Sequence, residues 1–338
     1  MTFLFADIGG TNARFGYTDS ESSNIKFIKS YEVRLYQTIE ESIKHYCSEH
    51  KISPHTLSLC VAAPTNKNSI VFTNNHWRFE RDAICKTLGI TQLLCINDFT
   101  AQALAQIPYF KNGLDRRGSN NSDVLESVNK GQPDDSSSVF VIGPGTGLGA
   151  STLVKVGDSF KALQAEGGHT HFSPTNKIEL DLLIWLQNKF GPVSTENVIS
   201  GAGLENIYQF LTSTVANLDG NELKAKDIGS LALNGDPLTI KAVNVMMGAL
   251  GTAVANGVLT TGSFQGVIIC GGIIPNLLDL FYKSPFFDRF TYNKPKYTTL
   301  LENVPIYISK DPYAGLKGCQ QALHNKFLKS EINRFMDD

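Results

Sequence analysis

Short runs of apolar residues recur along the chain and predict a set of β-strands with helices between them. The runs either alternate with polar residues or are rich in β-branched side chains, as is typical of strands in a sheet. They cover residues 3–6, 13–18, 57–62, 93–96, 138–142, 150–156, 266–269 and 305–308. Strands that alternate with helices, together with hairpins, predict an α/β protein with mixed sheets.

Helices are predicted where apolar residues recur at three- and four-residue spacing. Ile39, Ile43 and Tyr46 form one such set, and residues 178–186 and 204–211 contain others. Asp236 and Pro237 have the pattern of an N-cap followed by proline at the first helical position. A long helix is therefore predicted from this point to about residue 258.

Two of the predicted strands run into a glycine–threonine turn, and a second strand follows each turn at once. The stretches are FLFADIGGTNARFGYTD at 3–19 and SVFVIGPGTGLGASTLVKV at 138–156. One such turn is explained by a hairpin in which glycine supplies positive φ angles. Its repetition favours a duplicated fold, in which backbone N–H groups and threonine hydroxyls bind the phosphates of a nucleotide.

Two better-known phosphate-binding motifs do not describe these turns. Residues 145–150 match G-x-G-x-x-A, but that fingerprint needs a helix after the glycines, and the residues that follow predict a strand. The sequence also contains no G-x-x-x-x-G-K-[ST] motif of a P-loop. A nicotinamide-dependent oxidoreductase is therefore disfavoured.

Asp98 follows the predicted strand at 93–96 and precedes a predicted helix. Aspartate is common at helix N-caps, and this role alone would explain the residue. It could equally be a general base, because α/β sheets bind ligands at the carboxyl ends of their strands. Asn97 beside it could bind the same ligand.

Residues 163–172 contain Glu166, a glycine pair, His169 and His171. The two histidines would lie on one side of a strand, but no cysteine or further histidine nearby completes a zinc site. Recognition of sugar hydroxyls is favoured, because carboxylates accept hydrogen bonds and glycines let a ring approach the backbone. Glu196 could serve the same purpose or simply favour the first turn of a helix; the S-x-x-E capping-box spacing is absent there.

Composition indicates a globular protein of about two domains. The chain has 338 residues, 42% hydrophobic and 18% charged, with a formal net charge of −2. Nothing in this balance favours nucleic acid or an anionic membrane as a partner. The polar stretch at 112–138 is the best candidate for a domain-joining or surface segment, and the longest apolar stretch, 245–255, is shorter than the ~20 residues of a membrane span.

The remaining signals favour the cytoplasm. The first residues lead directly into a strand pattern, without the basic region or cleavage site of a signal peptide. Six cysteines are scattered along the chain without a CxxC pair, and most lie in apolar runs. We therefore expect reduced, buried thiols rather than a disulfide framework.

The motifs together resemble those of bacterial ATP-dependent glucokinases, which have the fold of hexokinase, actin and the heat-shock chaperone ATPases. The resemblance rests on DIGGTNAR (7–14), Ala63-Pro64, TNNHW (73–77), INDFTA (96–101), GPGTGLG (143–149), EGGHTHF (166–172), VSTENVISGAGL (193–204) and CGGIIP (270–275). It implies a two-domain duplicated actin-like ATPase (ribonuclease H-like) fold with mixed sheets and a central cleft. Residues 1–108 and a C-terminal helix at 312–338 would form a small α/β domain, and residues 109–311 a large one.

The resemblance also implies a role for each motif residue. Asp98 would accept the proton of the 6-hydroxyl of glucose, and Asp7 would orient Mg²⁺ through water. The sugar-binding residues would be Asn97, Glu166, His169 and Glu196. The nucleotide-binding residues would be Asp7, Gly9, Gly10, Thr11, Asn12, Gly145, Thr146, Gly147, Gly271 and Gly272. The products would be glucose 6-phosphate and ADP, and such enzymes are commonly homodimers.

Some alternatives stay open. The enzyme could act on fructose, mannose or an amino sugar, or the chain could be a sugar sensor without catalytic activity. The family usually has aspartate where this chain has His171, so the role of this second imidazole is open. Relatives that act as repressors carry a Cys-x-Cys-Gly zinc motif and an N-terminal DNA-binding helix pair, and neither is expected here.

Overall fold

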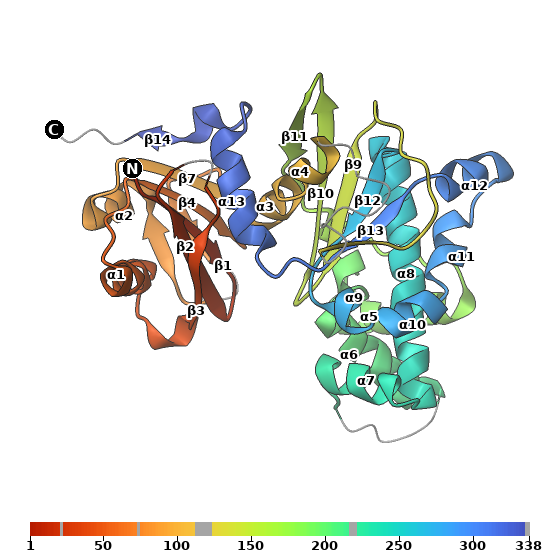
Figure 1. The fold of residues 1–338 in the computed structure, drawn as a ribbon. Helices are drawn as coiled ribbons and strands as arrows, with labels where there is room; N and C mark the ends of the chain where they lie inside the picture. Colours follow the sequence, from red (N-terminus) through yellow and green to blue (C-terminus); the bar gives the residue numbers. More distant parts are fainter. Residues whose placement is uncertain (21–22, 73–74, 112–123, 216–221, 335–338) are drawn as a thin grey trace. The chain divides into compact units, whose positions relative to one another are not determined.

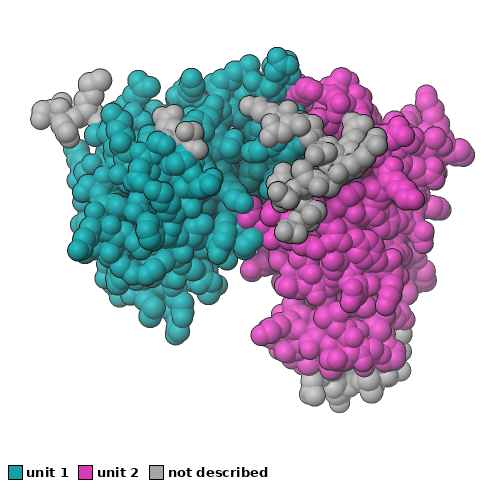
Figure 2. All heavy atoms as spheres, viewed as in Figure 1, with its two compact units in different colours: residues 1–116, 156–164, 312–338 teal, residues 117–155, 165–311 magenta. Residues whose placement is uncertain are grey.

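The computed structural model describes residues 1–20, 23–72, 75–111, 124–215 and 222–334 (Figure 1). The chain forms two compact units, which are coloured separately in Figure 2. Unit 1 comprises residues 1–116, 156–164 and 312–338, and unit 2 comprises residues 117–155 and 165–311. Unit 1 thus includes residues 109–116 and 156–164, which were predicted to belong to the large domain.

Unit 1 is built around a mixed sheet with the strand order β14-β7-β4-β1-β2-β3. Its strands are β1 (Phe3–Ile8), β2 (Asn12–Thr18), β3 (Lys26–Glu32), β4 (Thr56–Val61), β5 (Ser69–Val71), β6 (Arg78–Glu80), β7 (Gln92–Asn97), β11 (Ser159–Leu163) and β14 (Asn333–Arg334). Its helices are α1 (Ile39–His50), α2 (Arg81–Leu88), α3 (Asp98–Leu104), α4 (Ile107–Lys111) and α13 (Ala314–His324). β1, β4 and β7 are parallel, and β1 and β2 form an antiparallel hairpin.

The central sheet of unit 2 repeats this arrangement in the order β10-β9-β12-β13-β8. Its strands are β8 (Leu125–Ser127), β9 (Val139–Pro144), β10 (Leu148–Val156), β12 (Gly266–Ile269) and β13 (Ile306–Ser309). β9 and β10 form a hairpin, and β12 and β13 follow in parallel with β9. The predicted mixed sheets and the predicted duplication of the hairpin layout are confirmed.

Unit 2 contains one long helix, α8, and several shorter helices. They are α5 (Lys177–Phe190), α6 (Gly201–Phe210), α7 (Ala225–Leu233), α8 (Pro237–Thr261), α9 (Ile273–Asn276), α10 (Leu278–Lys283), α11 (Phe286–Thr291) and α12 (Pro295–Glu302). The predicted start of α8 is confirmed, because Asp236 caps it by accepting from Thr239 N at 2.8 Å. α8 contacts α6, α7, α11 and β9, and its buried residues belong to the core of this unit.

α8 is longer than the apolar stretch at 245–255 that was compared with the length of a membrane span. Among the described residues it is the one helix that is long and apolar enough, by length and composition, to cross a membrane. Its most apolar window has a mean hydropathy of 1.5, but 61% of that window is buried inside the protein. The apolar composition of α8 therefore reflects its place in a core.

Three other expectations need correction or limits. The C-terminal helix ends at His324 rather than continuing to residue 338. Part of the polar stretch at 112–138 forms a strand, because β8 pairs with β13, but residues 124–138 are all half-buried or exposed, as expected of a surface segment; residues 112–123 lie outside the described residues. All six cysteines are free thiols as expected, and all are buried except Cys47, which is half-buried.

A buried ion pair holds α5 against α11 in unit 2. Arg289 Nη1 and Nη2 donate to Glu179 Oε1 and Oε2 at 2.7 and 3.0 Å, and the Glu179 side chain is 2% exposed. A buried charge that loses its partner is strongly destabilising. The pair therefore restricts how α5 can lie on the core.

We expect Glu179→Gln to lower the free energy of unfolding by about 3–5 kcal/mol, because the Arg289 charge would stay buried without compensation. Chemical denaturation followed by circular dichroism measures this loss. Asp181→Asn on the same helix is the matched control, since its ion pair with Lys177 is 41% and 80% exposed. The control should lose no more than about 1 kcal/mol, and equal losses in both variants would contradict the assignment.

Candidate active site

The first glycine turn, residues 9–11, joins β1 to β2 in unit 1. Gly9 N donates to Asn12 O, and Val33 N donates to Thr11 O, both at 2.9 Å. Within the described part of the chain, the N–H groups of Gly10 and Thr11 donate to no backbone carbonyl. Thr11 and Asn12 are exposed, so these donors can serve an anionic ligand.

Asp7 lies in β1 just before this turn, and its carboxylate has close neighbours on both oxygens. Cys60 Sγ lies 3.5 Å from Oδ1, and Arg14 Nη1 lies 3.3 Å from Oδ2. The third neighbour is Gly315 in the first turn of α13: a Cβ atom there would lie 2.6 Å from the Asp7 carboxyl carbon. The glycine is therefore needed for the carboxylate to reach its position.

Arg14 is a candidate site residue that the sequence analysis did not assign. Its side chain is 42% exposed, and the hairpin register pairs it directly with Asp7. The guanidinium has further donors that could meet phosphate oxygens. The alternation of β2 could have indicated Arg14, because Asp7 and Arg14 are equidistant from the turn in the DIGGTNAR motif.

Asn97 and Asp98 share the junction of β7 and α3, also in unit 1. Asn97 is the N-cap: its Oδ1 accepts from Phe99 N at 2.9 Å and from Thr100 N at 3.2 Å. Asp98 is thus the first helical residue rather than the cap, and its Oδ1 accepts from Phe99 N at 2.8 Å. The helix N-terminus stabilises negative charge at this point.

The register of the parallel strands brings these groups to one edge of the sheet. Asp7 in β1 pairs with Cys60 in β4, and Val61 in β4 pairs with Asn97 in β7.

The hydrogen bond with Cys319 and burial raise the pKa of the Cys60 thiol well above its ordinary value, and the nearby charges of Asp7 and Asp98 add to the rise. Cys60 therefore stays protonated and able to donate to Asp7.

The second glycine turn, residues 145–147, joins β9 to β10 in unit 2. Gly145 N donates to Gly147 O at 2.8 Å, and Gly145 O accepts from Gly201 N at 2.9 Å, so the Gly145 N–H closes the turn itself. Among the described residues, the N–H groups of Thr146 and Gly147 donate to no backbone carbonyl. These two groups are the donors that a phosphate could use.

Neither turn depends on glycine for a left-handed backbone. Gly9, Gly10, Gly145 and Gly147 all have φ outside the positive range that favours glycine. Gly147 instead provides space, because a Cβ atom there would lie 2.4 Å from Glu196 Oε2. The explanation that these glycines supply positive φ angles is therefore wrong. Close approach of the Glu196 carboxylate accounts for Gly147.

Glu196 lies in a short 3-10 helix, η3 (Thr195–Asn197), and contacts the second turn. Its Oε2 accepts from Leu148 N at 2.7 Å. The helix has a capping box after all, because Asn197 Oδ1 accepts from Ser194 N at 2.8 Å in the place of the usual glutamate. The carboxylate of Glu196 is therefore held by Leu148 and not by the cap.

Glu166 precedes a second 3-10 helix, η2 (Gly167–His169), and His169 is its last residue; both side chains are exposed. The predicted strand that would carry the two histidines is not formed; His171 makes only an isolated bridge with Ser194. Gly168 packs so tightly that a Cβ atom there would lie 1.9 Å from Leu148 O. The backbone of η2 and the carboxylate of Glu196 thus both contact Leu148 at the start of β10.

Gly271 and Gly272 follow β12, at the edge where β9 also ends. Gly271 has φ +84°, and a Cβ atom there would lie 2.5 Å from Pro144 O. Glycine is required at position 271 because the backbone has a positive φ angle and because a Cβ atom would clash with the Pro144 carbonyl oxygen. The parallel register of β9 and β12 brings this turn next to the second glycine turn.

Unit 1 thus gathers Asp7, the first turn, Asn97 and Asp98, and unit 2 gathers the second turn, Glu166, His169, Glu196 and the Gly271–Gly272 turn. The part of the chain that the structure describes contains no cluster of three or more histidine, cysteine or acidic side chains that could bind a metal. A single carboxylate such as Asp7 suits Mg²⁺ that arrives with nucleotide phosphates and keeps most of its waters.

Comparisons with known proteins identify the family. The family model described as Glucokinase matches residues 4–326. The chain is 37% identical over 342 residues to a glucokinase of Helicobacter acinonychis, with 97% of both proteins covered. The chain belongs to the glucokinase family. This membership confirms the resemblance to glucokinases and the kinase class.

Solved structures with the same fold include glucokinases from several organisms. The glucokinase of an Antarctic psychrotroph superposes with a TM-score of 0.79 at 29% identity, with 96% of this chain and 98% of that chain covered. A glucokinase of Streptomyces griseus, crystallised with glucose and AMPPNP, superposes with a TM-score of 0.61 at 20% identity, with 95% and 98% covered. The predicted fold class is confirmed.

We expect Gly315→Ala to lower kcat/KM for MgATP by about 10- to 100-fold, because the added Cβ atom would displace the Asp7 carboxylate. Glucose binding measured by calorimetry should stay unchanged. Gly248→Ala on α8 is the control, since the nearest atom to its Cβ would be Pro285 Cγ at 3.5 Å. Unchanged kinetics in Gly315→Ala would show that the position of Asp7 is not critical.

Proposed function

We propose that the enzyme transfers the γ-phosphoryl group of ATP to the 6-hydroxyl of glucose, with Asp98 as the general base. The observation that supports this most strongly is the common sheet edge of Asp98, Asp7 and the first glycine turn in unit 1. A base and a phosphate-binding backbone in one place suit phosphoryl transfer, which needs alignment and charge neutralisation more than covalent chemistry.

The base receives its proton from the attacking hydroxyl. Asp98 Oδ1 is bonded to Phe99 N, which fixes the carboxylate, and we assign this carboxylate to the 6-hydroxyl. As this proton leaves, O6 attacks the γ-phosphorus and the bond to the ADP oxygen breaks. Asn97 would hold a neighbouring hydroxyl through its amide N–H group, because its carbonyl oxygen is engaged in the cap.

Unit 2 supplies the other sugar contacts. Glu166 and Glu196 would accept hydrogen bonds from hydroxyls, and His169 would bind a further hydroxyl. These exposed or half-buried polar groups provide a hydrogen-bonding surface for a polyol. A site made to bond specific hydroxyls discriminates strongly against sugars that lack them.

The nucleotide would be held by backbone groups of both glycine turns. Thr11, Asn12 and Thr146 would add side-chain contacts, while the Gly271–Gly272 turn would border the adenosine. ATP as the donor agrees with the AMPPNP bound by the Streptomyces griseus relative. Asp7 would orient Mg²⁺ through water, and Mg²⁺ would neutralise phosphate charge.

Three wider features belong to the same proposal. We assign the small domain to residues 1–108 and 312–338 and the large domain to residues 109–311, whereas unit 1 also includes residues 109–116 and 156–164. We also propose a homodimer, as is common for such enzymes, and a cytoplasmic location in agreement with six free thiols.

A panel of hexoses tests the substrate. With MgATP and coupled detection of ADP, we expect glucose to give the highest kcat/KM among glucose, fructose, mannose and glucosamine. Phosphorus NMR of the product should show a phosphate ester at the 6-position. A higher kcat/KM for another hexose would transfer the proposal to that sugar, and sugar binding without ADP release would instead support a sensor.

Asp98→Asn tests the base. We expect kcat to fall at least ~10²-fold, because asparagine cannot accept the proton, while glucose binding by calorimetry is retained. The amide oxygen can still accept from Phe99 N, so the fold should be unaffected. Asp82→Asn is matched to it, since Asp82 is an exposed acid in the first turn of α2 in the same unit. Near-normal turnover of Asp98→Asn would refute the assignment.

A further inference from the structure

Two threonine hydroxyls join the segments that carry the acidic sugar-binding residues of unit 2. Thr170 follows η2, and its Oγ1 donates to Gly167 O at 2.9 Å. Thr195 begins η3, and its Oγ1 donates to Thr170 O at 3.0 Å. The two hydroxyl oxygens lie 3.2 Å apart, and Thr195 N donates to Thr170 O at 2.8 Å.

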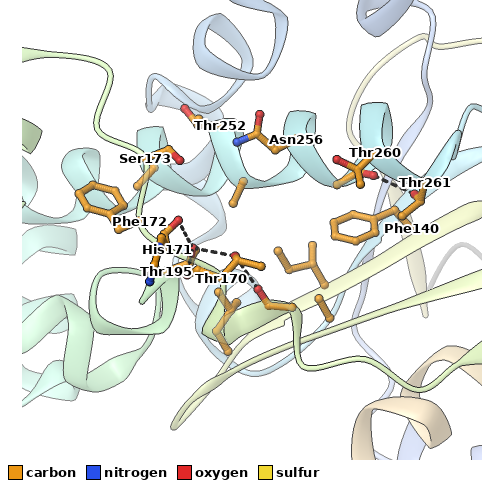
Figure 3. A pocket seen from close by; sticks show the side chains of 17 residues that line it. Phe140, Thr170, His171, Phe172, Ser173, Thr195, Thr252, Asn256, Thr260 and Thr261 are labelled. Atoms are coloured by element: carbon orange, nitrogen blue, oxygen red, sulfur yellow. Dashed lines mark hydrogen bonds between the residues drawn. The ribbon is translucent and has the colours of Figure 1, made fainter. Parts of the chain in front are cut away.

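These contacts are on the wall of a cavity of about 260 Å³ in unit 2. Figure 3 shows the side chains of Thr170 and Thr195 pointing toward each other, with Thr252, Asn256 and Thr260 of α8 across the cavity. Thr195 is 6% exposed, so its hydroxyl has little access to water. A buried hydroxyl depends on protein partners, and here these partners belong to the other segment.

The segments have little other regular structure to hold them together. η2 and η3 are each one 3-10 turn of three residues, and their nearest sheet-like contact is the isolated bridge between His171 and Ser194. Recognition of a sugar requires its polar contacts to be held within about 0.5 Å of the productive geometry. The spacing of Glu166 and Glu196 must therefore be set by local hydrogen bonds.

We infer that the Thr170–Thr195 hydroxyl pair is a positioning device that sets the distance between Glu166 and Glu196 for sugar binding. This inference rests on the proposed sugar-binding roles of the two acids. Neither threonine is a catalytic residue in our assignment; each acts through the acid on its own segment. Glu166 lies one residue before η2, and Glu196 lies one residue after Thr195.

Loss of the hydroxyl pair should leave the contacts around the second glycine turn in place. Glu196 keeps its bond to Leu148 N, and Gly168 stays packed on Leu148 O, without help from either hydroxyl. Loss of the pair should therefore loosen the relative position of the two acids and not the second glycine turn. The expected signature is a defect in sugar affinity alone.

Thr195→Val removes the hydroxyl and keeps the shape of the side chain. We expect the apparent KM for glucose to rise about tenfold, in line with the loss of the hydrogen bond that Thr195 Oγ1 donates to Thr170 O, with kcat and the KM for MgATP unchanged. The dissociation constant for glucose, measured by calorimetry without nucleotide, should rise by the same factor. Thr195→Ser restores the hydroxyl and should restore both values.

Thr260→Val is the matched control, because Thr260 lines the same cavity from α8. It should leave glucose affinity unchanged, and the thermal midpoints of all three variants should be compared. Unchanged glucose affinity in Thr195→Val, or a defect that Thr195→Ser does not repair, would overturn the inference. An enzyme that phosphorylates glucose but shows either result refutes only the positioning role, whereas absence of phosphorylation in the wild type refutes the proposed function itself.

Discussion

The common direction of the parallel strands is the constraint on which both halves of the site depend. In unit 1, β1, β4 and β7 end at the same edge, so Asp7 and Asp98 become neighbours although a long stretch of chain separates them. In unit 2, β9 and β12 end together and bring the second glycine turn beside Gly271. Carboxyl ends of strands are where α/β sheets bind ligands, and the duplicated topology produces such an edge twice.

The strands and the long helices were predictable because their signals are local. Alternation in β2 and β10 and the Asp236–Pro237 start of α8 need only a few consecutive residues to be recognised. The motifs likewise identified the residues that gather at the two sheet edges. The duplication could be predicted because both hairpins keep the same glycine–threonine turn.

The finer geometry was not predictable, because it depends on contacts between distant segments. Nothing near Glu196 in the sequence indicates that its carboxylate binds Leu148 N. Asn197 was not expected to complete a capping box, because its amide oxygen performs a role usually filled by glutamate. The helix η2 replaced an expected strand, since the glycines before His169 pack on β10.

α13, whose Gly315 leaves room for the Asp7 carboxylate, lies close to the C-terminal end of the chain. α13 packs on β1 and β4, and Cys319 on it lies 3.4 Å from the Ala6 carbonyl oxygen, 313 positions away in sequence. A ribosome releases the sheet of unit 1 long before it releases this helix. The face of the sheet that α13 covers therefore stays exposed while the ribosome synthesises unit 2. Chaperone binding during translation would protect that face.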